Sequence, residues 1–247
     1  MNKFELMINH EQEITKEQEI NFQHGLEKLR KNTPIQYITN SQEFMKLHFY
    51  VDENVLIPQP DTEILVEEVI KYAKEFQNNN SELQILDLCT GSGAIAISLA
   101  KYIDNCKITA TDISSKAIQI AKLNAEKNLI HKKIHFIESD MFDNLQTNQF
   151  DIIVSNPPYI ESETIQTLSP EVQKEPKIAL DGGQDGLKLY RTIVKHFKNY
   201  LKPTGKVFLE IGYNQKENLF KIIKSENPNK QPICIQDLAG NNRVIIF

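Results

Sequence analysis

From residue 83 onward, short apolar segments of strand length alternate with amphipathic segments of helix length. The pattern predicts seven strands, at residues 83–88, 107–111, 134–137, 150–155, 205–211, 233–238 and 243–247. It predicts helices at residues 94–102, 115–128, 187–200 and 214–224. Strands separated by helices pair in parallel through right-handed crossovers, whereas the last two strands are close in sequence and should pair antiparallel. The fold class is therefore α/β: a Rossmann-like, mostly parallel sheet with an antiparallel C-terminal hairpin.

The first 80 residues have a different pattern. Residues 1–33 are predicted to be helical, because apolar residues recur among charges over 11–31 before Pro34 ends the helix. Two short strands should follow within 43–57, with a turn at 52–54, and then a helix capped by Asp61 or Thr62 that runs to about residue 76. A polar loop at 78–81 marks a boundary. We therefore expect a helical segment (1–33), a β-hairpin linker with a helix (34–80) and a main domain (81–247).

A glycine-rich loop follows the first strand of the main domain, where ligands of such sheets bind. Gly91 and Gly93 permit a sharp turn and a close approach to a ligand. Asp112 ends the next strand 21 residues after Gly91, near the spacing of roughly 20 residues typical of a carboxylate that binds a ribose. A tight turn and a helix-capping aspartate are the structural alternative. The pattern favours a nucleoside-containing cofactor, either NAD or S-adenosylmethionine. Asp87 favours the second, because it could receive a cationic amino group and would repel a pyrophosphate.

The fourth strand ends in the tetrapeptide Asn156-Pro157-Pro158-Tyr159. The prolines have no N–H, so carbonyl groups there can face a ligand without a competing donor. If the Asn156 side-chain oxygen and the Pro157 carbonyl accept both N–H bonds of a planar amino group, its nitrogen can pyramidalise and attack a methyl group, while these oxygens stabilise the growing positive charge. Tyr159 could pack on the planar group. The alternative is a Pro-Pro turn that only ends a strand.

Composition excludes several classes of protein. The formal net charge of −5 argues against a general affinity for nucleic acid. No apolar stretch is long enough for a membrane helix, and the N-terminus does not resemble a secretory signal. Three scattered cysteines fit a reducing cytoplasm, and the histidines lack metal-ligand spacing. We expect a cytoplasmic monomer without a metal, stable nucleic-acid binding or membrane attachment.

Further motifs accompany the glycine loop and the tetrapeptide. They are PIQYI (34–38), VLIPQPDTE (55–63), ATDIS (110–114), EP (175–176), ALDGG (179–183), LEIG (209–212) and DLAG (237–240). In these residues the chain resembles the HemK/PrmC family, class I S-adenosylmethionine-dependent methyltransferases that modify the N5 atom of a glutamine. The resemblance makes residues 81–247 the catalytic domain.

The resemblance implies S-adenosyl-L-methionine as cofactor and S-adenosyl-L-homocysteine as product. The methionine end would lie on residues 89–93, the ribose on Asp112, and the adenine beside Asp140 and Met141. The expected cofactor-binding residues are Asp87, Cys89, Thr90, Gly91, Ser92, Gly93, Asp112, Asp140, Met141 and Asn156. The implied substrate is the glutamine of the Gly-Gly-Gln motif in class 1 peptide chain release factors. The catalytic and substrate-binding residues would be Asn156, Pro157, Pro158 and Tyr159.

Three features depart from the family pattern. Gln59 stands where the family usually has arginine, Met141 where it often has tryptophan, and only 33 residues precede Pro34. Two other functions stay open: an adenine amino-methyltransferase, which would need base flipping, and an inactive cofactor-binding module. Glu210, at the end of the fifth strand, could either approach the active site or stabilise a turn beside Gly212.

Overall fold

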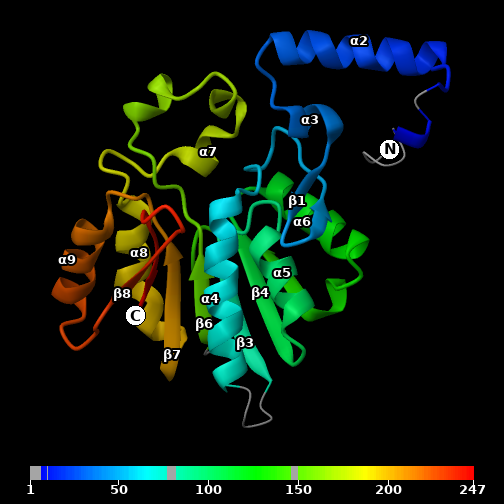
Figure 1. Cartoon of the computed structure of the whole chain (residues 1–247). Helices are drawn as coiled ribbons and strands as arrows, with labels where there is room; N and C mark the ends of the chain where they lie inside the picture. Colours follow the sequence, from blue (N-terminus) through cyan, green and yellow to red (C-terminus); the bar gives the residue numbers. More distant parts are fainter. Residues whose placement is uncertain (1–6, 10, 77–81, 146–149) are drawn as a thin grey trace.

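The computed structural model describes residues 7–9, 11–76, 82–145 and 150–247, and most of them belong to a seven-stranded sheet with helices on both faces (Figure 1). The strand order is β5-β4-β3-β6-β7-β9-β8. The bounds are β3 Leu83–Leu88, β4 Cys106–Asp112, β5 Ile134–Glu138, β6 Phe150–Ser155, β7 Leu201–Glu210, β8 Ile233–Gln236 and β9 Asn242–Ile246. The first five pair in parallel, and β9 pairs antiparallel with both β7 and β8. The predicted fold class and the C-terminal antiparallel pair are confirmed.

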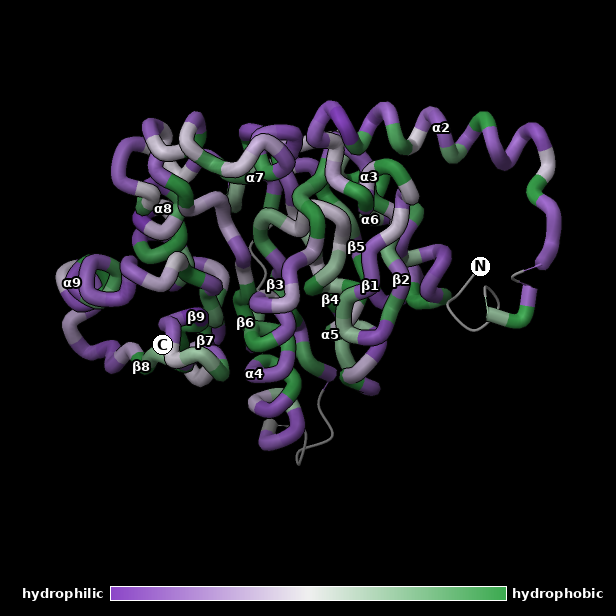
Figure 2. The backbone as a smooth tube through the Cα atoms, turned by 45° about the horizontal axis from the view of Figure 1, so that its top comes forward, coloured by the Kyte–Doolittle hydropathy of each residue, from purple (hydrophilic) through white to green (hydrophobic). Residues whose placement is uncertain are grey.

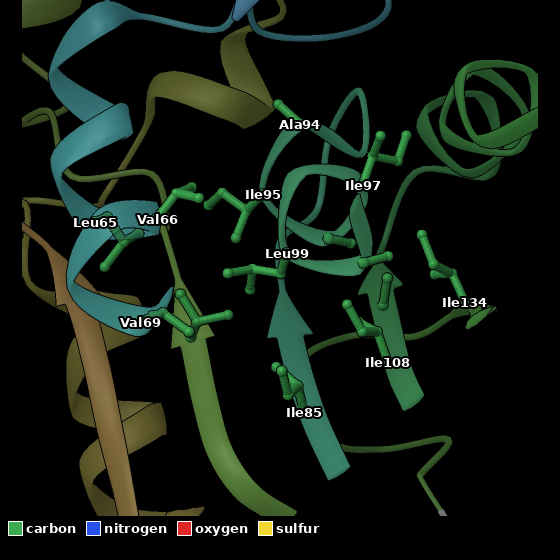
Figure 3. Close-up of a cluster of buried hydrophobic side chains, with 14 of the residues drawn as sticks. Leu65, Val66, Val69, Ile85, Ala94, Ile95, Ile97, Leu99, Ile108 and Ile134 are labelled. Carbon is green, nitrogen blue, oxygen red and sulfur yellow. The ribbon is translucent and has the colours of Figure 1, made fainter. Parts of the chain in front are cut away.

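Two hydrophobic layers hold the helices against the sheet. Ile85 of β3 belongs to the layer under α4 (Pro60–Phe76), α5 (Ala94–Tyr102) and α6 (Ser115–Lys127), which Figure 3 shows in part. Its neighbour Leu86 belongs to the opposite layer, under α8 (Lys188–His196) and α9 (Lys216–Glu226). Successive strand residues point to opposite faces, so a strand covered on both sides must be apolar throughout. This requirement explains the consecutive apolar residues Ile85-Leu86 in β3 and Ile152-Ile153-Val154 in β6.

Several boundaries differ from the prediction. The helix expected over 187–200 ends at His196 and continues as the 3₁₀ turn η5 (Phe197–Asn199), and β7 already begins at Leu201. Both changes arise because Tyr200 and Leu201 pair with the start of β6: the Phe150 N–H donates to the Tyr200 carbonyl at 2.6 Å. The predicted loop at 78–81 lies outside the described residues, and the division into three domains stays a prediction.

The linker hairpin is present, but its turn was placed wrongly. β1 (Gln42–Phe44) and β2 (Leu47–Phe49) pair antiparallel across Met45 and Lys46, whose φ angles are 49° and 59°. Two consecutive positive φ angles define the tight hairpin turn that Asn-Gly sequences normally signal, and Met-Lys gives no such signal. The predicted turn residues 52–54 follow the hairpin instead, where the Asn54 N–H donates to the Asp52 side chain at 2.9 Å.

Two helix starts also differ from the prediction. Residues 1–33 were predicted to be helical throughout, but residues 12–15 are not helical and helix α2 (Lys16–Arg30) begins only at Lys16, where Thr15 and Gln18 form a capping box. Helix α2 lies at the periphery next to the short helix α3 (Ile35–Thr39), and no residue of α2 is buried (Figures 1 and 2). Helix α4 begins at Pro60, a residue favoured at the first helical position, so Asp61 and Thr62 lie in its first turn and do not cap it.

The segment between β6 and α8, for which the sequence predicted no helix or strand, covers the carboxyl ends of the strands. It contains η3 (Thr164–Thr167), η4 (Val172–Lys174) and α7 (Lys177–Leu180), between β6 and α8 (Figure 1). It returns to the tetrapeptide at Gly182, where a Cβ atom would lie 2.7 Å from the Tyr159 Cα and 2.8 Å from the Pro158 carbonyl oxygen. Only glycine allows this approach, so Gly182 of the ALDGG motif positions the segment that contains η3, η4 and α7 over the end of β6.

A buried asparagine joins the linker to the glycine loop. The side chain of Asn124 in α6 accepts from the Tyr50 N–H at 2.7 Å and donates to the carbonyls of Tyr50 at 3.0 Å and Ser92 at 2.9 Å. One side chain therefore satisfies three backbone groups from two distant segments.

We expect Asn124→Ala to lower the free energy of unfolding by about 2–4 kcal/mol, because it leaves these buried backbone groups without partners. Urea denaturation measures the change. The matched control is Asn128→Ala, one turn further along, where the side chain donates to the His48 carbonyl near the surface and the expected loss is below about 1 kcal/mol. Equal losses for both variants would contradict this role.

Candidate active site

The glycine loop has the backbone geometry that the sequence predicts. Gly91 and Gly93 have φ angles of 55° and 82°, and Gly93 is the N-cap of α5. A Cβ atom on Gly93 would lie 2.9 Å from the Ile97 Cδ1 and 3.1 Å from the Ala121 Cβ, so this glycine lets α5 and α6 pack closely. A Cβ atom on Gly91 would have open space around it. Gly91 therefore presents bare backbone to a ligand space.

Asp112 is attached to the glycine loop. Its Oδ2 accepts from the Gly91 N–H at 2.8 Å, and its Oδ1 accepts from the Ser114 N–H at 2.9 Å. Burial raises the pKa of Asp112, and the backbone N–H donors partly oppose this effect. Each carboxylate oxygen can accept more than one hydrogen bond, so acceptor capacity is left for ribose hydroxyls.

Asp87 lies under the loop. Its Oδ2 accepts from the Thr90 hydroxyl at 2.6 Å and from the Ala96 N–H at 3.2 Å, while its buried Oδ1 has no hydrogen-bond partner among the described residues. Burial raises the pKa of Asp87 to about 7. Asp87 thus shapes the loop and retains one unpaired acceptor.

A cavity of about 240 Å³ opens beside these elements at the carboxyl ends of β3, β4 and β6. Seven predicted site residues line it: Cys89, Gly91, Asp112, Asp140, Met141, Asn156 and Pro158. The other four cofactor candidates, Asp87, Thr90, Ser92 and Gly93, are not among its described lining residues. Its carboxylates, exposed glycine backbone and apolar wall fit a cofactor with a ribose and a planar base.

A second cavity of about 180 Å³ lies on the other side of the tetrapeptide. Asn156, Pro157 and Tyr159 line it, together with the buried carboxyl groups of Glu175 and Glu210. Both cavities are lined by Leu56, Asn156 and Ala179. Asn156 therefore lies where a molecule in one cavity would meet a molecule in the other.

The amide of Asn156 is oriented by a residue of α4. The Asn156 Nδ2 donates to the Thr62 hydroxyl oxygen at 3.1 Å, which leaves the Asn156 Oδ1 to accept. From the sequence, Thr62 was expected only as a possible helix cap, and its position in PDTE carries no direct signal of this contact. Folding brings together residues 62 and 156 because α4 packs on the sheet beside β7 and β9.

Of the two carboxyl groups at the second cavity, Glu175 was not predicted from the sequence and the role of Glu210 was left open. Glu175 accepts from the Ile57 N–H at 2.9 Å, and burial raises its pKa to about 7. Burial also raises the pKa of Glu210 to about 7. The turn beside Gly212 is held by Gln215, whose Oε1 accepts from the Gly212 N–H at 2.9 Å. Glu210 thus approaches the candidate site, and the proposed turn role belongs to another residue.

The described ranges of the chain contain neither a metal-ligand cluster nor a membrane-spanning helix. Within them, no group of three or more His, Cys, Asp or Glu side chains could hold a metal ion. No helix in this part of the chain combines the length and apolar character needed to cross a bilayer.

Comparisons with known proteins agree with this architecture. The "Methyltransferase small domain" family model matches residues 62–225, and the "PrmC N-terminal domain" model matches residues 1–39. A release factor glutamine methyltransferase of Streptococcus pneumoniae is 39% identical, with 96% of this chain and 82% of that protein covered. A solved methyltransferase of Pyrococcus furiosus has a TM-score of 0.56 at 19% identity and covers 94% of this chain and 98% of its own.

The fold and these matches define a class I methyltransferase. Within that class, the chain belongs to the HemK/PrmC family. A bifunctional methyltransferase of Rickettsia conorii is also 39% identical over 98% of this chain, but the chain spans only 50% of that relative.

We expect Glu175→Gln to change how stability depends on pH. Folding raises the pKa of Glu175 from about 4.5 to about 7. Between these pH values the folded state keeps a proton that the unfolded state has lost. The free energy of unfolding therefore falls as the pH rises from about 4.5 to 7. Glutamine stays neutral and can still accept from Ile57. The variant should therefore gain roughly 1–3 kcal/mol relative to the wild type between pH 5 and pH 8.

Urea denaturation at the two pH values measures this gain. Glu171→Gln, an exposed change on the same segment, is the control and should follow the wild type. Parallel pH curves for the wild type and Glu175→Gln would refute the assignment.

Proposed function

We propose that this chain transfers a methyl group from S-adenosyl-L-methionine to the side-chain amide nitrogen of the glutamine in the Gly-Gly-Gln motif of class 1 peptide chain release factors. The observation that carries the proposal is the position of Asn156 between two cavities, with its amide nitrogen bound to Thr62. Relatives named as release factor glutamine methyltransferases support the choice of substrate. We further propose that the protein acts as a cytoplasmic monomer.

The larger cavity would hold the cofactor. Asp112 would accept from the ribose hydroxyls, while Asp140 and Met141 would border the adenine. The loop residues Cys89, Thr90, Gly91, Ser92 and Gly93 would enclose the methionine portion, with Asp87 as the carboxylate nearest its amino group. When bound, S-adenosylmethionine supplies an activated methyl group on a sulfonium centre.

The smaller cavity would hold the glutamine side chain. An amide nitrogen is a poor nucleophile because its lone pair is delocalised into the carbonyl group. The Asn156 Oδ1 and the Pro157 carbonyl would accept its two N–H bonds, hold it in line with the methyl group and stabilise the positive charge that develops. Pro158 and Tyr159 would complete the pocket, and the methylated amide would lose a proton after transfer. No separate general base is needed, because an N-methylated cationic amide is strongly acidic.

Peptide mass analysis tests the activity. A purified class 1 release factor incubated with the protein and S-adenosylmethionine should gain the mass of one CH₂ group on the glutamine of its Gly-Gly-Gln loop. A release factor with alanine in place of that glutamine should gain nothing. Equal labelling of both factors, or methylation of adenine in an added RNA or DNA but not of the factor, would contradict the proposal.

We expect Asn156→Ala to lower turnover by roughly 10²–10³-fold, because it removes a preorganised acceptor from the reaction centre. Cofactor affinity, measured by calorimetry, should change little. Asn105→Ala, at an exposed position, is the control for both measurements. Turnover that survives the loss of Asn156 would remove it from the catalytic role.

We expect Asp112→Ala to weaken cofactor binding by about 1.5–3 kcal/mol, the scale of a hydrogen bond to a charged group. Calorimetric titration measures the affinity. Because Asp112 also binds Gly91, the melting temperature without cofactor shows whether the loop itself has been lost. Unchanged affinity in a folded variant would exclude Asp112 as the ribose ligand.

A further inference from the structure

We propose that Glu210, as a neutral carboxylic acid, donates a hydrogen bond to the side-chain carbonyl oxygen of the substrate glutamine and so selects which end of that amide faces the methyl group. Glu210 would then be a substrate-binding residue of the smaller cavity. The inference rests on the proposed function, because it assigns a partner to the half of the glutamine amide that Asn156 and Pro157 leave unbound.

The side chain of Glu210 lies in the wall of the smaller cavity with half of its carboxyl group unpaired. Glu210 ends β7, is 2% exposed and lines this cavity. Its Oε1 accepts from the Tyr159 hydroxyl at 3.5 Å, a long hydrogen bond. Its buried Oε2 has no hydrogen-bond partner among the described residues. Buried polar atoms are almost always paired, so the unpaired oxygen points to a ligand as its missing partner.

The surroundings of Glu210 favour the protonated form of its carboxyl group. Within the described residues, no lysine, arginine or histidine lines the smaller cavity, whereas a second buried carboxyl group, that of Glu175, does. A carboxylate buried without donors is unfavourable, because nothing replaces the water that it loses. Burial accordingly raises the pKa of Glu210 to about 7. In the neutral form Oε2 carries a proton that it can donate, while Oε1 stays an acceptor for Tyr159.

The charged and titratable groups on neighbouring elements do not reverse this preference. Asp61 of α4 opposes ionisation of Glu210, whereas Arg243 of β9 favours it. The Arg243 guanidinium is already bound to two other carboxylates, at 2.8 Å from Asp61 and 3.0 Å from Asp237. Its charge is therefore largely balanced before it acts on Glu210. Burial raises the pKa of Tyr159, which stays a neutral donor.

The glutamine amide needs a donor at this place. A primary amide has an NH₂ end and a carbonyl end of similar shape and opposite hydrogen-bonding character. In the proposed reaction, Asn156 and Pro157 accept from the NH₂ end, which leaves the carbonyl oxygen to be paired. The amide and hydroxyl groups that line this cavity, those of Gln59, Asn156 and Tyr159, each already donate to a protein acceptor. A neutral Glu210 supplies the missing proton.

Ionisation of Glu210 would reverse the orientation of the substrate amide. A carboxylate can only accept, so it would attract the NH₂ end of the glutamine and repel its carbonyl oxygen. The amide would then turn its oxygen toward the methyl group, and the nitrogen would be out of line for attack. Productive binding therefore requires the proton on Glu210, and binding takes up a proton wherever the free carboxyl group is ionised.

The pH dependence of kcat/KM for the release factor tests this requirement in the whole protein. For the wild type it should fall about 5–10-fold between pH 7.5 and pH 8.5, because only the protonated fraction of the free protein binds productively. Glu210→Gln keeps an N–H donor of the same shape at every pH, so its kcat/KM should change less than about 2-fold relative to that range. The control Glu217→Gln, an exposed change at the start of α9, should follow the wild type.

Two further variants separate substrate binding from a structural role. Glu210→Leu leaves the glutamine carbonyl oxygen without a donor, so kcat/KM should be lower by roughly 5–50-fold at pH 6.5 and no longer fall with pH. The end of β7 keeps its backbone contact, since the neutral Tyr190 hydroxyl of α8 donates to the Glu210 carbonyl at 2.7 Å. Glu175→Gln should retain the wild-type fall. A fall that disappears in Glu175→Gln and persists in Glu210→Gln would overturn the assignment.

Proton uptake on binding tests the inference without turnover. The release factor is titrated calorimetrically into the protein with S-adenosyl-L-homocysteine at pH 8, in buffers of different ionisation enthalpy. We expect the wild type to take up about 0.5–1 proton more per bound factor than Glu210→Gln. A factor with alanine in place of the glutamine should not show this difference. The same uptake with the alanine factor would mean that burial alone protonates Glu210, which would refute the hydrogen bond to the glutamine.

The outcomes distinguish this inference from the proposed function. A wild type that methylates the factor without the extra proton uptake, or with a kcat/KM that does not fall above pH 7.5, would overturn the role of Glu210 alone. A wild type that binds the factor with the expected uptake and does not methylate it would overturn only the proposed function. A wild type that neither binds nor methylates the factor would overturn both.

Discussion

One hydrogen bond determines how this site can work: the Asn156 amide nitrogen donates to Thr62 at 3.1 Å. An asparagine side chain has a donor end and an acceptor end of nearly the same shape, so its chemistry depends on which end is already bound. Because Thr62 binds the donor end, the acceptor end is left at the boundary between the two cavities. The mostly parallel sheet brings the glycine loop to the same edge, and α4 carries Thr62 to it.

Much of the fold follows from hydrophobic periodicity. Strands β3 and β6 contribute apolar residues to both faces of the sheet, and helix-length segments separate most of the strands along the chain, so the class and the parallel pairing could be inferred from sequence. The hairpin turn at Met45 and Lys46 could not be inferred, because neither residue is a glycine or asparagine, the residues that usually signal positive φ angles in a hairpin turn. The starts of α2 and α4 were misplaced because Thr15 and Pro60 set them through local capping geometry.

The residues of the candidate site also fall into two groups, those that could be predicted from the sequence and those that could not. Gly91, Asp112 and Asn156 lie at strand ends, so their spacing along the chain predicts that they meet at one edge of the sheet. Thr62, Glu175 and Glu210 come from a helix, a covering segment and another strand, and no spacing rule joins them to Asn156. The positions of Glu175 and Glu210 at the smaller cavity, and of buried Thr62 against Asn156, emerge only when the tertiary packing is known. Asp87, also predicted at the cofactor, lies under the loop, where Thr90 and Ala96 donate to its Oδ2 and its Oδ1 has no partner among the described residues.

A crystal structure with S-adenosyl-L-homocysteine and a Gly-Gly-Gln peptide in place would test the central claim most directly. The account predicts that the glutamine amide nitrogen lies within about 2.7–3.2 Å of the Asn156 Oδ1, with the Asn156 Nδ2 still bound to Thr62. A complex in which the Asn156 nitrogen faces the glutamine nitrogen, or in which the peptide amide lies outside the smaller cavity, would contradict it.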